Sequence, residues 1–553
     1  MHSWPVVHVN TAVTGALLKI VWELSVPMPR KANPAVARTA PTIRVAKMRR
    51  IRGNFANIGA IVGHRIGSPP KAFALDERLK MLQTSSGRTL VRPAHLLRRP
   101  ARAASRPVMW LWAHRLHPRA PLWLLSALSL ASLGARLLYL GNPVDSATGK
   151  SSLIFDEAFY VNAARVILGI HPQSGASYVT APLFHDPNAE HPPLAKMLVA
   201  GSMKVLGDNA WGWRIFPVIF GSAAILGVYW LVRSAKGSSW LALGAAALFA
   251  ADNLILVHGR IDTLDIFVVT FMILAVGLYL RDRPVLAGIA LAFALCTKLV
   301  ALDVFFIILL LEIARVIRRH PDETRERWAI VRERVWPLLT TAGIGVVGYL
   351  TLLFALDLIV APIGGPGTCA TVPSGFHNPI SHTNFMLCYA GKLTSPNGPT
   401  GIASYPWQWL LNQVPINYFT LANNVLVNGK VSTTNNVVAF MGEMNPAIVF
   451  LALPALGLAI HSAWTRRDTF STLCVAWFLA TFVPFVVGAA PLGTYGNRTS
   501  YLYYMVIVMP VICAAVAQLF SRRWLPGAAV FGYVAILGYW FVTLYPFRTW
   551  SGH

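Results

Sequence analysis

The feature that most constrains this chain is the recurrence of long apolar runs separated by short polar segments. Most of them approach the ~20 residues that a helix needs to cross ~30 Å of hydrocarbon. The runs are 121–140, 215–232, 239–255, 266–280, 299–311, 337–361, 447–460, 471–490, 502–520 and 525–544. A shorter run, 284–297, has basic residues near both ends, and their long side chains can reach a membrane surface. The sequence therefore predicts an all-α polytopic membrane protein with about eleven transmembrane helices.

The composition agrees with a membrane environment. Hydrophobic residues make up 55% of the 553 residues and charged residues only 13%, whereas soluble domains average about 25% charged residues. Most of the chain is therefore expected to contact lipid or other apolar side chains, and the bilayer is a predicted partner.

The formal net charge of +26 is concentrated before the first apolar run. Residues 1–120 hold 21 Lys and Arg but only three acidic residues, a surplus of 18. The positive-inside rule accounts for this surplus more simply than nucleic-acid binding, so no nucleic-acid partner is predicted. We interpret residues 1–108 as a basic, disordered cytoplasmic extension. An over-long reading frame, with translation starting at Met109, stays open as the alternative and would be tested by N-terminal peptide mapping.

Further basic clusters follow alternate apolar runs and set the predicted orientation. They are Arg233 and Lys236, Arg281 and Arg283, the stretch 318–334, Arg466 and Arg467, and Arg522 and Arg523. The opposite, extracytoplasmic side then carries residues 141–213, 258–262, 362–445 and 491–499. We expect a multi-pass plasma-membrane protein with a catalytic membrane region at 109–361, an outer loop at 362–445 and a second membrane region at 446–553.

One apolar segment is predicted to lie on the membrane instead of crossing it. Residues 194–206 have a helical pattern but would form only ~20 Å of helix, and they include Lys196 and Lys204. Counting this segment as a span would place nearly every later basic cluster outside. We therefore predict an interfacial helix within the first outer loop.

The first outer loop contains an acidic pair, Asp156 and Glu157, that could supply a general base. The same pair could instead stabilise the N-terminus of a helix over 157–168. Adjacent side chains on a helix diverge by ~100°, so the two carboxylates cannot address one reacting atom. We expect only one of them to be the base.

A second polar group in this loop is Glu190-His191-Pro192-Pro193, followed by Lys196. The prolines are expected to start the interfacial helix, which places His191 and Lys196 at a helix N-terminus suited to an anion. Lys196 could also merely extend to the membrane surface. Glu190 and His191 could bind a divalent metal, although no cofactor is predicted with certainty; exhaustive chelation would test this.

Charged residues also stand at the predicted outer ends of later spans. Arg260 and Asp265 flank the start of the fourth span, and Lys298 lies at the end of the fifth. Internal pairing, for example of Asp265 with Lys298, and binding of a lipid phosphate are both open. Arg498 lies among tyrosines, including Tyr503, where a cation–π contact or an interfacial aromatic belt would also explain the pattern.

The five cysteines are too few for a disulfide framework. Three of them, Cys296, Cys474 and Cys513, fall in predicted spans, where buried free thiols are the simplest interpretation. Cys369 and Cys388 share the large outer loop, where a bridge is permitted. The sequence leaves bridged and free forms equally open.

Several of these motifs together resemble those of the protein O-mannosyltransferases, within the wider class of membrane glycosyltransferases that use polyprenyl-phosphate sugars. The likeness rests on Phe155-Asp156-Glu157, on 191–196 and 208–214 (Asp-Asn-Ala-Trp-Gly-Trp-Arg), on Arg260 with Asp265, on 404–409, and on 498–504. It covers about residues 120–546. Two departures are Phe159, where many members have His or Tyr, and an outer loop at 362–445 too short for an added lumenal trefoil domain.

The resemblance implies an eleven-span fold and a specific reaction. Asp156 would be the catalytic base, with Glu157, Glu190 and His191 lining the site. Candidates for the lipid phosphate are Lys196, Arg260 and Arg498, and Asp265 and Tyr503 are also taken as substrate-binding positions. The implied activity is transfer of mannose from polyprenyl-phosphate-mannose to Ser or Thr hydroxyls of secreted or membrane proteins, by a single displacement that inverts the anomer.

Two other functions stay open at this point. The chain could transfer another polyprenyl-phosphate-linked sugar to a lipid or cell-wall polymer, as the aminoarabinose transferases of similar architecture do. A transporter of lipid-linked sugars would also need phosphate-binding cations but would not need Asp156. Identification of the labelled product as glycolipid or glycoprotein distinguishes the first alternative from protein mannosylation. A transporter would move the lipid-linked sugar across the membrane without consuming it.

Overall fold

The computed structural model describes residues 117–144, 149–318, 324–364, 369, 378–427, 430–490, 497–521 and 526–546. All of them belong to the compact unit formed by residues 95–553. The prediction of a disordered extension over residues 1–108 lies outside the described residues, as do Arg522 and Arg523.

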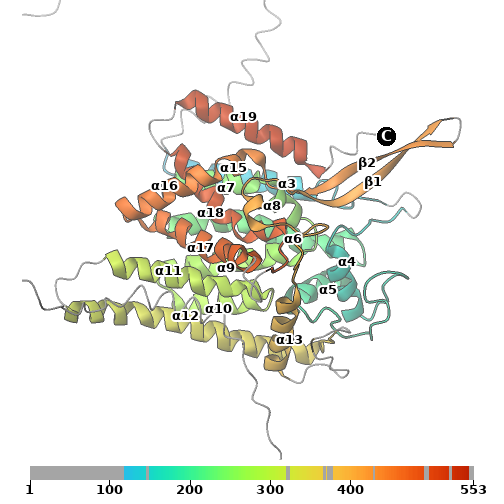
Figure 1. The fold of residues 1–553 in the computed structure, drawn as a ribbon, viewed down its shortest axis with the longest axis horizontal. Coiled ribbons are helices and arrows are strands. Elements are labelled where there is room, and N and C mark those ends of the chain that lie inside the picture. Colours follow the sequence, from blue (N-terminus) through green and yellow to red (C-terminus); the bar gives the residue numbers. More distant parts are fainter. Residues whose placement is uncertain are drawn as a thin grey trace, which may run out of the picture. The chain divides into compact units, whose positions relative to one another are not determined.

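Each of the eleven apolar runs is occupied by helix (Figure 1). The helices over these runs are α3 (Ala120–Leu137), α6 (Ala210–Ser234), α7 (Ser239–Ala250), α8 (Asn253–His258), α9 (Leu264–Leu280), α10 (Pro284–Leu295), η1 (Leu299–Leu302), α11 (Asp303–Arg318), α12 (Thr324–Ile359), α15 (Pro446–Phe450), α16 (Ala452–Thr465), α17 (Thr469–Ala489), η3 (Leu502–Ile507), α18 (Met509–Phe520) and α19 (Gly527–Leu544). The prediction of helical runs is thus confirmed element by element.

The number of membrane crossings is not confirmed by this arrangement. Among the described residues, five helices are long and apolar enough to cross a bilayer. They are Ala120–Leu137, Ala210–Ser234, Val331–Ile359, Thr469–Ala489 and Gly527–Leu544. Four further apolar helices have 10–17 residues: α7, α9, α10 and α18. The chain is therefore a multi-span helical membrane protein, and the figure of eleven stays a prediction.

The shorter helices arise where a polar side chain or a change of helix type interrupts an apolar run. In the run 239–255, Asp252 ends α7 and starts α8 by accepting a 3.1 Å hydrogen bond from the backbone N–H of Ile255. The other oxygen of Asp252 accepts the N–H of Asn445 at 2.9 Å. A buried carboxylate with such partners is satisfied without water, so the apolar run can be broken inside the protein.

The first outer loop forms two helices, α4 (Glu157–Ile167) and α5 (Leu194–Leu206). The bounds of α5 are those predicted from the sequence, and its 13 residues are too few to cross a bilayer. Helix α5 packs between α4 and α6. Its position on a membrane surface stays a prediction.

The second outer loop departs from the all-α prediction. After α13 (Pro379–Lys392) and α14 (Pro406–Trp409), the chain forms an antiparallel hairpin of β1 (Ile416–Val427) and β2 (Lys430–Gly442). The signal was present in the sequence, because Asn428-Gly429 is the residue pair that favours tight hairpin turns. The same loop contains the Cys369–Cys388 disulfide, which settles the alternative left open by the sequence.

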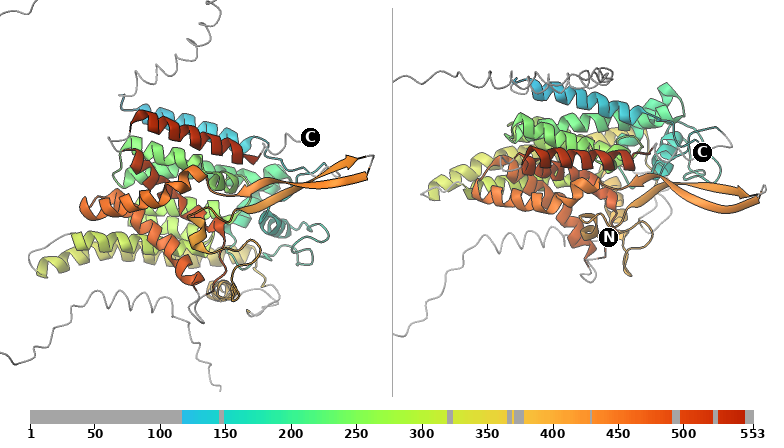
Figure 2. Two further views of the ribbon diagram at one scale, coloured as in Figure 1. Left: turned by 45° about the horizontal axis from the view of Figure 1, so that its top comes forward. Right: turned by 90° about the horizontal axis from the view of Figure 1, so that it is seen from above.

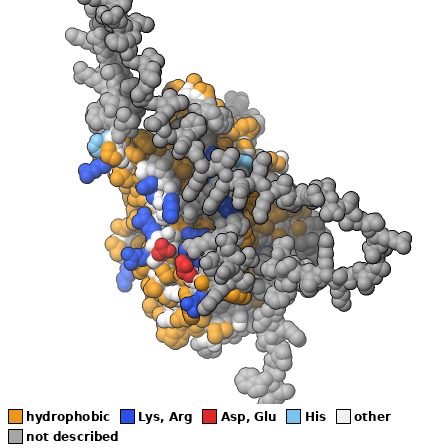
Figure 3. All heavy atoms as spheres, turned by 90° about the vertical axis from the view of Figure 1, so that its left-hand side faces the viewer, with side chains coloured by type: hydrophobic (Ala, Val, Ile, Leu, Met, Phe, Trp, Pro, Cys, Tyr) orange, Lys and Arg blue, Asp and Glu red, His pale blue; other side chains and the backbone are white. Residues whose placement is uncertain are grey.

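The basic turns and the first outer loop lie at opposite ends of the helices. Arg233 and Lys236 at the end of α6 are exposed, as are Arg281 and Arg283 between α9 and α10. Figure 3, which faces the left-hand side of Figure 1, shows Lys and Arg side chains gathered on that surface. Helices α4 and α5 lie on the right in Figure 1, and the hairpin extends beyond the helices on the same side.

The first and last described helices are joined by a contact between their ends. Helices α3 and α19 run in similar directions (Figure 2). The hydroxyl of Tyr545, just after α19, donates a short hydrogen bond to the carbonyl of Ala135 in α3. This contact adjoins Arg260, whose surroundings are described below.

Candidate active site

The adjacent acids Asp156 and Glu157 have different surroundings, as expected from the geometry of a helix. Glu157 is the first residue of α4 and is fully buried. Its Oε1 accepts a 2.8 Å hydrogen bond from Nε of Arg214, and its Oε2 a 2.7 Å bond from Nη2. It also accepts the backbone N–H groups of Ile154 and Asp262, at 2.8 and 3.0 Å. Glu157 therefore joins the first outer loop to α6 and to the loop before α9.

The partners of Glu157 explain the tryptophan-containing motif at 208–214. Asp208 accepts hydrogen bonds from Arg165 of α4 at 2.9 Å and from the indole of Trp213 at 2.6 Å. Asn209 begins α6 by accepting the N–H of Trp211 at 2.9 Å. The motif thus orients Arg214 towards Glu157 and holds α4 against α6.

Asp156 occupies a different environment from that of Glu157. It is half-buried, and within the described part of the chain its carboxylate forms neither an ion pair nor a side-chain hydrogen bond. Burial raises the pKa of Asp156 to about 7; the nearby Lys298 lowers it in part, and Asp265 raises it further. A carboxylate with a pKa near neutrality is suited to accept a proton in a reaction.

The backbone just before Asp156 is strained. Phe155 has φ of +53°, in the left-handed region that non-glycine residues rarely adopt and that costs about 1–3 kcal/mol. Its ring stacks on Tyr418 at 4.1 Å and meets the ring of Tyr503 edge-on at 5.5 Å. Packing of this ring fixes where the next residue, Asp156, can point.

Tyr418 is itself held from two sides. Its hydroxyl lies 2.8 Å from Nε2 of His258, whose Nδ1 lies 2.8 Å from the hydroxyl of Thr263. At Gly442, on the opposite strand, a Cβ would lie 2.3 Å from Cζ of Tyr418. The close approach of the tyrosine ring to the backbone therefore requires glycine at this position.

Asp265 and Lys298, at the outer ends of α9 and α10, form the ion pair considered from the sequence. Oδ1 of Asp265 lies 2.7 Å from Nζ of Lys298. The ammonium also lies 5.6 and 5.4 Å from the ring centroids of Tyr503 and Tyr504. Lys298 was not among the predicted site residues, yet it is the cation that influences Asp156 most.

The Glu190–His191 segment lies close to Tyr160. The rings of Tyr160 and His191 are 6.1 Å apart, and Asp156 and Glu190 both act electrostatically on Tyr160. Burial, followed by Lys298 and Lys196, holds the pKa of His191 well below its usual range, so its imidazole is neutral near pH 7. Burial raises the pKa of Glu190, whose Oε1 accepts a 2.7 Å bond from Asn188.

Lys196 is not near an exposed helix N-terminus, contrary to the sequence-based expectation. Its ammonium is fully buried and pairs with Asp186 at 2.6 Å. It also donates to the carbonyls of Asn188 and His191, at 2.5 and 2.9 Å. Because the ammonium bonds to carbonyls on both sides of Glu190, Lys196 holds the Glu190–His191 segment from inside.

The same segment is held from the second outer loop. Nε2 of His382, in α13, lies 2.9 Å from the carbonyl oxygen of Ala189, and its Nδ1 lies 2.9 Å from Asp357 of α12. Just after α12, the carbonyl of Ala361 accepts the backbone N–H of Asp186 at 3.0 Å, and the N–H of Ile363 donates to the carbonyl of Asp186 at 2.8 Å. His382 thus connects the segment that carries Glu190 to the loop stabilised by the Cys369–Cys388 bridge.

Arg260 is also engaged by protein groups. It is 2% exposed, and its Nη2 donates to the carbonyls of Leu138 and Tyr139, both at 2.9 Å, just after α3. Its Nη1 lies 3.2 Å from the hydroxyl of Tyr545. A cation that satisfies the free carbonyls at a helix C-terminus stabilises that helix end.

Arg498 is more accessible than Lys196 and Arg260. It is half-buried, and its Nη1 donates to the carbonyl of Ala390 at 2.5 Å. The charge of Arg498 interacts electrostatically with Tyr501 and Tyr504, and Asp156 also interacts electrostatically with Tyr501. Tyr501 stacks on Tyr503 at 5.3 Å. Of the predicted site residues, Asp156, Asp265, Arg498 and Tyr503 therefore surround one aromatic-lined region together with Lys298.

A metal site at Glu190 and His191 would need further ligands. Among the described residues, no three His, Cys, Asp or Glu side chains converge in a way that could hold a metal ion. Glu190 and His191 would supply two ligands at most, and one oxygen of Glu190 is already bonded to Asn188. The residues do not form a metal centre, and we derive no step through one.

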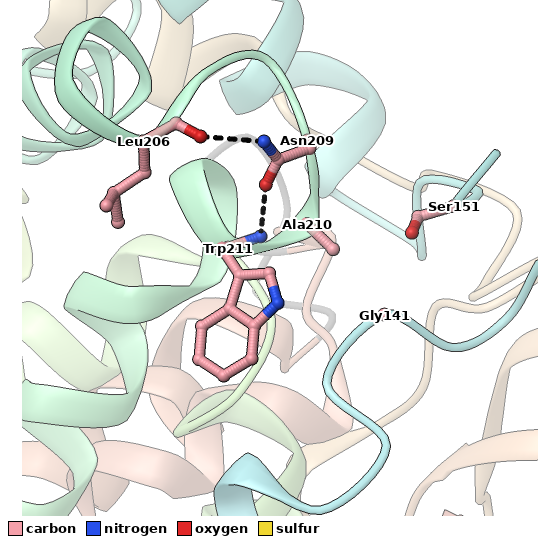
Figure 4. Close-up of a pocket in the computed structure, with 6 residues that line it drawn as sticks. All are labelled: Gly141, Ser151, Leu206, Asn209, Ala210 and Trp211. Carbon is pink, nitrogen blue, oxygen red and sulfur yellow. Dashed lines mark hydrogen bonds between the residues drawn. The ribbon is translucent and has the colours of Figure 1, made fainter.

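A separate pocket of about 400 Å³ lies where α5 meets α6 (Figure 4). It is lined by Gly141, Ser151, Leu206, Asn209, Ala210 and Trp211. In Figure 4, Asn209 bonds to the carbonyl of Leu206 and to the N–H of Trp211, so its polar atoms serve the helix start. None of the predicted site residues lines this pocket, and we do not place the chemistry there.

Comparison with solved structures identifies the fold. The chain aligns with a chain of the Saccharomyces cerevisiae protein O-mannosyltransferase Pmt1-Pmt2 complex bound to the sugar donor. The TM-score is 0.54 at 12% sequence identity, covering 78% of this chain and 89% of that one. The chain therefore shares the fold of that protein O-mannosyltransferase chain.

Sequence comparisons show which proteins the chain is similar to. Residues 204–357 match the family described as dolichyl-phosphate-mannose-protein mannosyltransferase. A polyprenol-phosphate-mannose–protein mannosyltransferase of Mycolicibacterium smegmatis is 25% identical over 78% of this chain and 90% of its own length. The Corynebacterium glutamicum protein of the same name is 25% identical over 72% of this chain and 83% of its own length. The predicted resemblance to the protein O-mannosyltransferases is confirmed.

Proposed function

We propose that this chain is an enzyme that transfers mannose from polyprenyl-phosphate-mannose to Ser or Thr hydroxyls of proteins. The observation that carries the proposal is a half-buried Asp156 with a pKa raised to about 7, next to cations and tyrosines at one end of a helical membrane protein. The relatives named as mannosyltransferases support the choice of donor and acceptor.

The reaction we propose is a single displacement. The acceptor hydroxyl oxygen forms a bond to the anomeric carbon of mannose as the bond from that carbon to the phosphate oxygen breaks. Asp156 accepts the hydroxyl proton, and the polyprenyl phosphate leaves with the bonding electrons. The anomeric configuration is inverted because attack and departure occur on opposite faces.

Stabilisation of the leaving phosphate is assigned to Lys298 and Arg498. Both cations act on the tyrosines that surround Asp156, and fixed positive charge at a developing anion is a large contribution to catalysis. Lys196 and Arg260, which with Arg498 were the candidates from the sequence, are 0% and 2% exposed with their charges engaged by protein oxygens, whereas the Lys298 side chain is 12% exposed beside Asp265. We assign Lys196 and Arg260 to holding the site together.

The remaining polar residues are assigned to the sugar. Neutral His191 and half-buried Glu190 could exchange hydrogen bonds with sugar hydroxyls, and Asp265 would orient Lys298. Tyr503 would pack beside the donor near Lys298. Glu157 pairs with Arg214 and so fixes the start of α4, next to Asp156. We do not propose that Glu157 contacts the substrate.

We further propose that the site lies on the extracytoplasmic face of the plasma membrane. The exposed basic turns after α6 and α9 lie at the other end of the helices, as the positive-inside rule requires for the cytoplasmic side. A polyprenyl-linked donor would enter from the bilayer and the acceptor protein from the aqueous side. The membrane regions 109–361 and 446–553 would then share one site with the outer loop 362–445.

The experiment that tests this function is a membrane transfer assay with polyprenyl-phosphate-mannose and a Ser/Thr-rich secreted acceptor. Asp156→Asn should reduce transfer by about 10²- to 10⁴-fold, the usual contribution of a general base, while the protein stays folded and inserted. Retained turnover would overturn the role of Asp156. Labelled glycolipid in place of glycoprotein would favour the alternative of sugar transfer to a lipid or cell-wall polymer.

A further inference from the structure

The hairpin of β1 and β2 is a two-stranded sheet in a protein that is otherwise helical in its described parts. Its strands have 12 and 13 residues, and it extends beyond the helices on the side of α4 and α5 (Figure 1). Two strands leave two outer edges, and each edge presents backbone N–H and C=O groups that a further strand could pair with.

The base of the hairpin is anchored differently on the two strands. On β2, the side-chain amide of Asn253 in α8 donates to the carbonyl of Met441 at 2.8 Å and to that of Glu443 at 3.2 Å. Helix α8 therefore occupies the outer edge of β2 where the hairpin begins. Within the described residues the sheet has two strands, so the outer edge of β1 pairs with no further strand.

The base of β1 also lies against the residue that precedes the proposed catalytic Asp156. Tyr418, the third residue of β1, stacks on Phe155, the residue before Asp156, at 4.1 Å. The charge of Asp156 acts on the Tyr418 hydroxyl. A polypeptide lying along the outer edge of β1 would therefore reach Asp156 as it reaches the base of the strand.

The hairpin is regular where such pairing would be required. From Thr420 to Val425, β1 pairs without interruption with Val438 to Thr433 of β2, and register shifts occur only on either side of this stretch. Six residues of strand span about 20 Å. Natural edge strands are commonly protected by proline or lysine, but residues 416–442 contain no proline and a single lysine, Lys430, next to the turn.

We propose that the acceptor polypeptide binds in extended form as a third strand on the outer edge of β1, which leads its Ser or Thr residue to Asp156. In backbone pairing of this kind, main-chain hydrogen bonds supply the affinity for an extended chain. The inference rests on the proposed function, because it names how the acceptor of that reaction is held.

The first test shortens the hairpin without touching its base. Residues 422–436 are replaced by Asn-Gly, which closes the chain between the paired residues Leu421 and Val437. For an extended peptide acceptor of about ten residues, KM should rise about tenfold or more, because several backbone hydrogen bonds are lost. For N-acetyl-threonine amide, which is too small to lie along the strand, kcat/KM should stay within about twofold of wild type. Lys430→Ala, which keeps the hairpin length, is the matched control and should leave both values unchanged.

The second test uses the wild-type chain, so it does not depend on folding of the variant. A series of acceptor peptides carries one N-methyl group, moved along one residue at a time. In an added strand, alternate N–H groups face the edge, so KM should rise at every second position. Equal effects at all positions, or an unchanged KM in the shortened chain, would overturn the inference while the proposed function stands. Absence of transfer by wild type to both acceptors would instead overturn the proposed function.

Discussion

Arg214 donates two hydrogen bonds, of 2.8 and 2.7 Å, to the carboxylate of Glu157, 57 positions earlier in the chain, and both side chains are buried. This pairing separates the roles of two neighbouring acids, because it fixes Glu157 against α6 and leaves Asp156 without an ion-pair partner in the described residues. The charged residues of this region therefore divide into those paired inside the protein, such as Glu157, and those left at the site, such as Asp156.

The Glu157–Arg214 pair predicts a strong effect on stability. Glu157→Ala leaves the Arg214 guanidinium buried and uncompensated, which costs about 3–5 kcal/mol. Thermal unfolding of the purified protein in detergent should show a clear fall in Tm, while Asp156→Asn should leave Tm close to wild type. A Glu157→Ala protein as stable as wild type would contradict the structural role of the pair.

The raised pKa of Asp156 predicts the pH dependence of transfer. A general base must be ionised, and Asp156 becomes protonated as the pH falls through its pKa of about 7. We therefore expect kcat/KM to be constant above this pH and to decrease about tenfold per pH unit below it. The residual activity of Asp156→Asn should lack this dependence. A wild-type profile that is flat between pH 5 and 8 would argue against Asp156 as the base.

The four candidate cations should fall into two groups. Lys298→Gln and Arg498→Gln should lower kcat by about 10²- to 10³-fold, the usual cost of removing one group that stabilises a developing anion. Lys196→Gln leaves Asp186 buried without its ion pair and should chiefly reduce stability and yield. Comparison of kcat with Tm for each variant separates the groups. Full activity of Lys298→Gln would remove it from the phosphate site.

His382 should stabilise the Glu190–His191 segment from the second outer loop. His382→Phe removes the partners of the Ala189 carbonyl and of Asp357, and each buried group left unsatisfied costs about 1–3 kcal/mol. The Tm should fall, and Asp357→Asn should cause a smaller fall because His382 keeps its bond to Ala189. Equal Tm values for His382→Phe and wild type would show that this connection is dispensable.

The sequence predicted the helical runs well because apolar length is a local property. The segment 194–206, predicted as a helix separate from the spans, forms α5 with the same bounds, and the different surroundings expected for Asp156 and Glu157 are observed. The breaks within the apolar runs could not be predicted in the same way. A buried residue such as Asp252 can interrupt a helix only if a distant segment supplies a hydrogen bond to its carboxylate, as the backbone N–H of Asn445 does.

The roles of the lysines and arginines near the site could not be assigned from local sequence. Lys196, Arg260 and Lys298 all stand beside apolar segments, and only tertiary contacts decide which charge is engaged internally. Asp186, whose pairing buries Lys196, is ten positions away in a loop without a recognisable motif. The hairpin had a local signal in Asn428-Gly429, but the surrounding apolar runs favoured an all-helical interpretation.

The hydrogen bond from Tyr545 to Ala135 has a consequence for biogenesis. Tyr545 follows the last described helix, so it leaves the ribosome after every other described helix has been made. Until then, Arg260 lacks its hydroxyl partner and the first helix lacks its link to the last. A nascent chain stopped before residue 545 would be inserted yet unfinished, and quality-control proteases could recognise it by the loose end of α3.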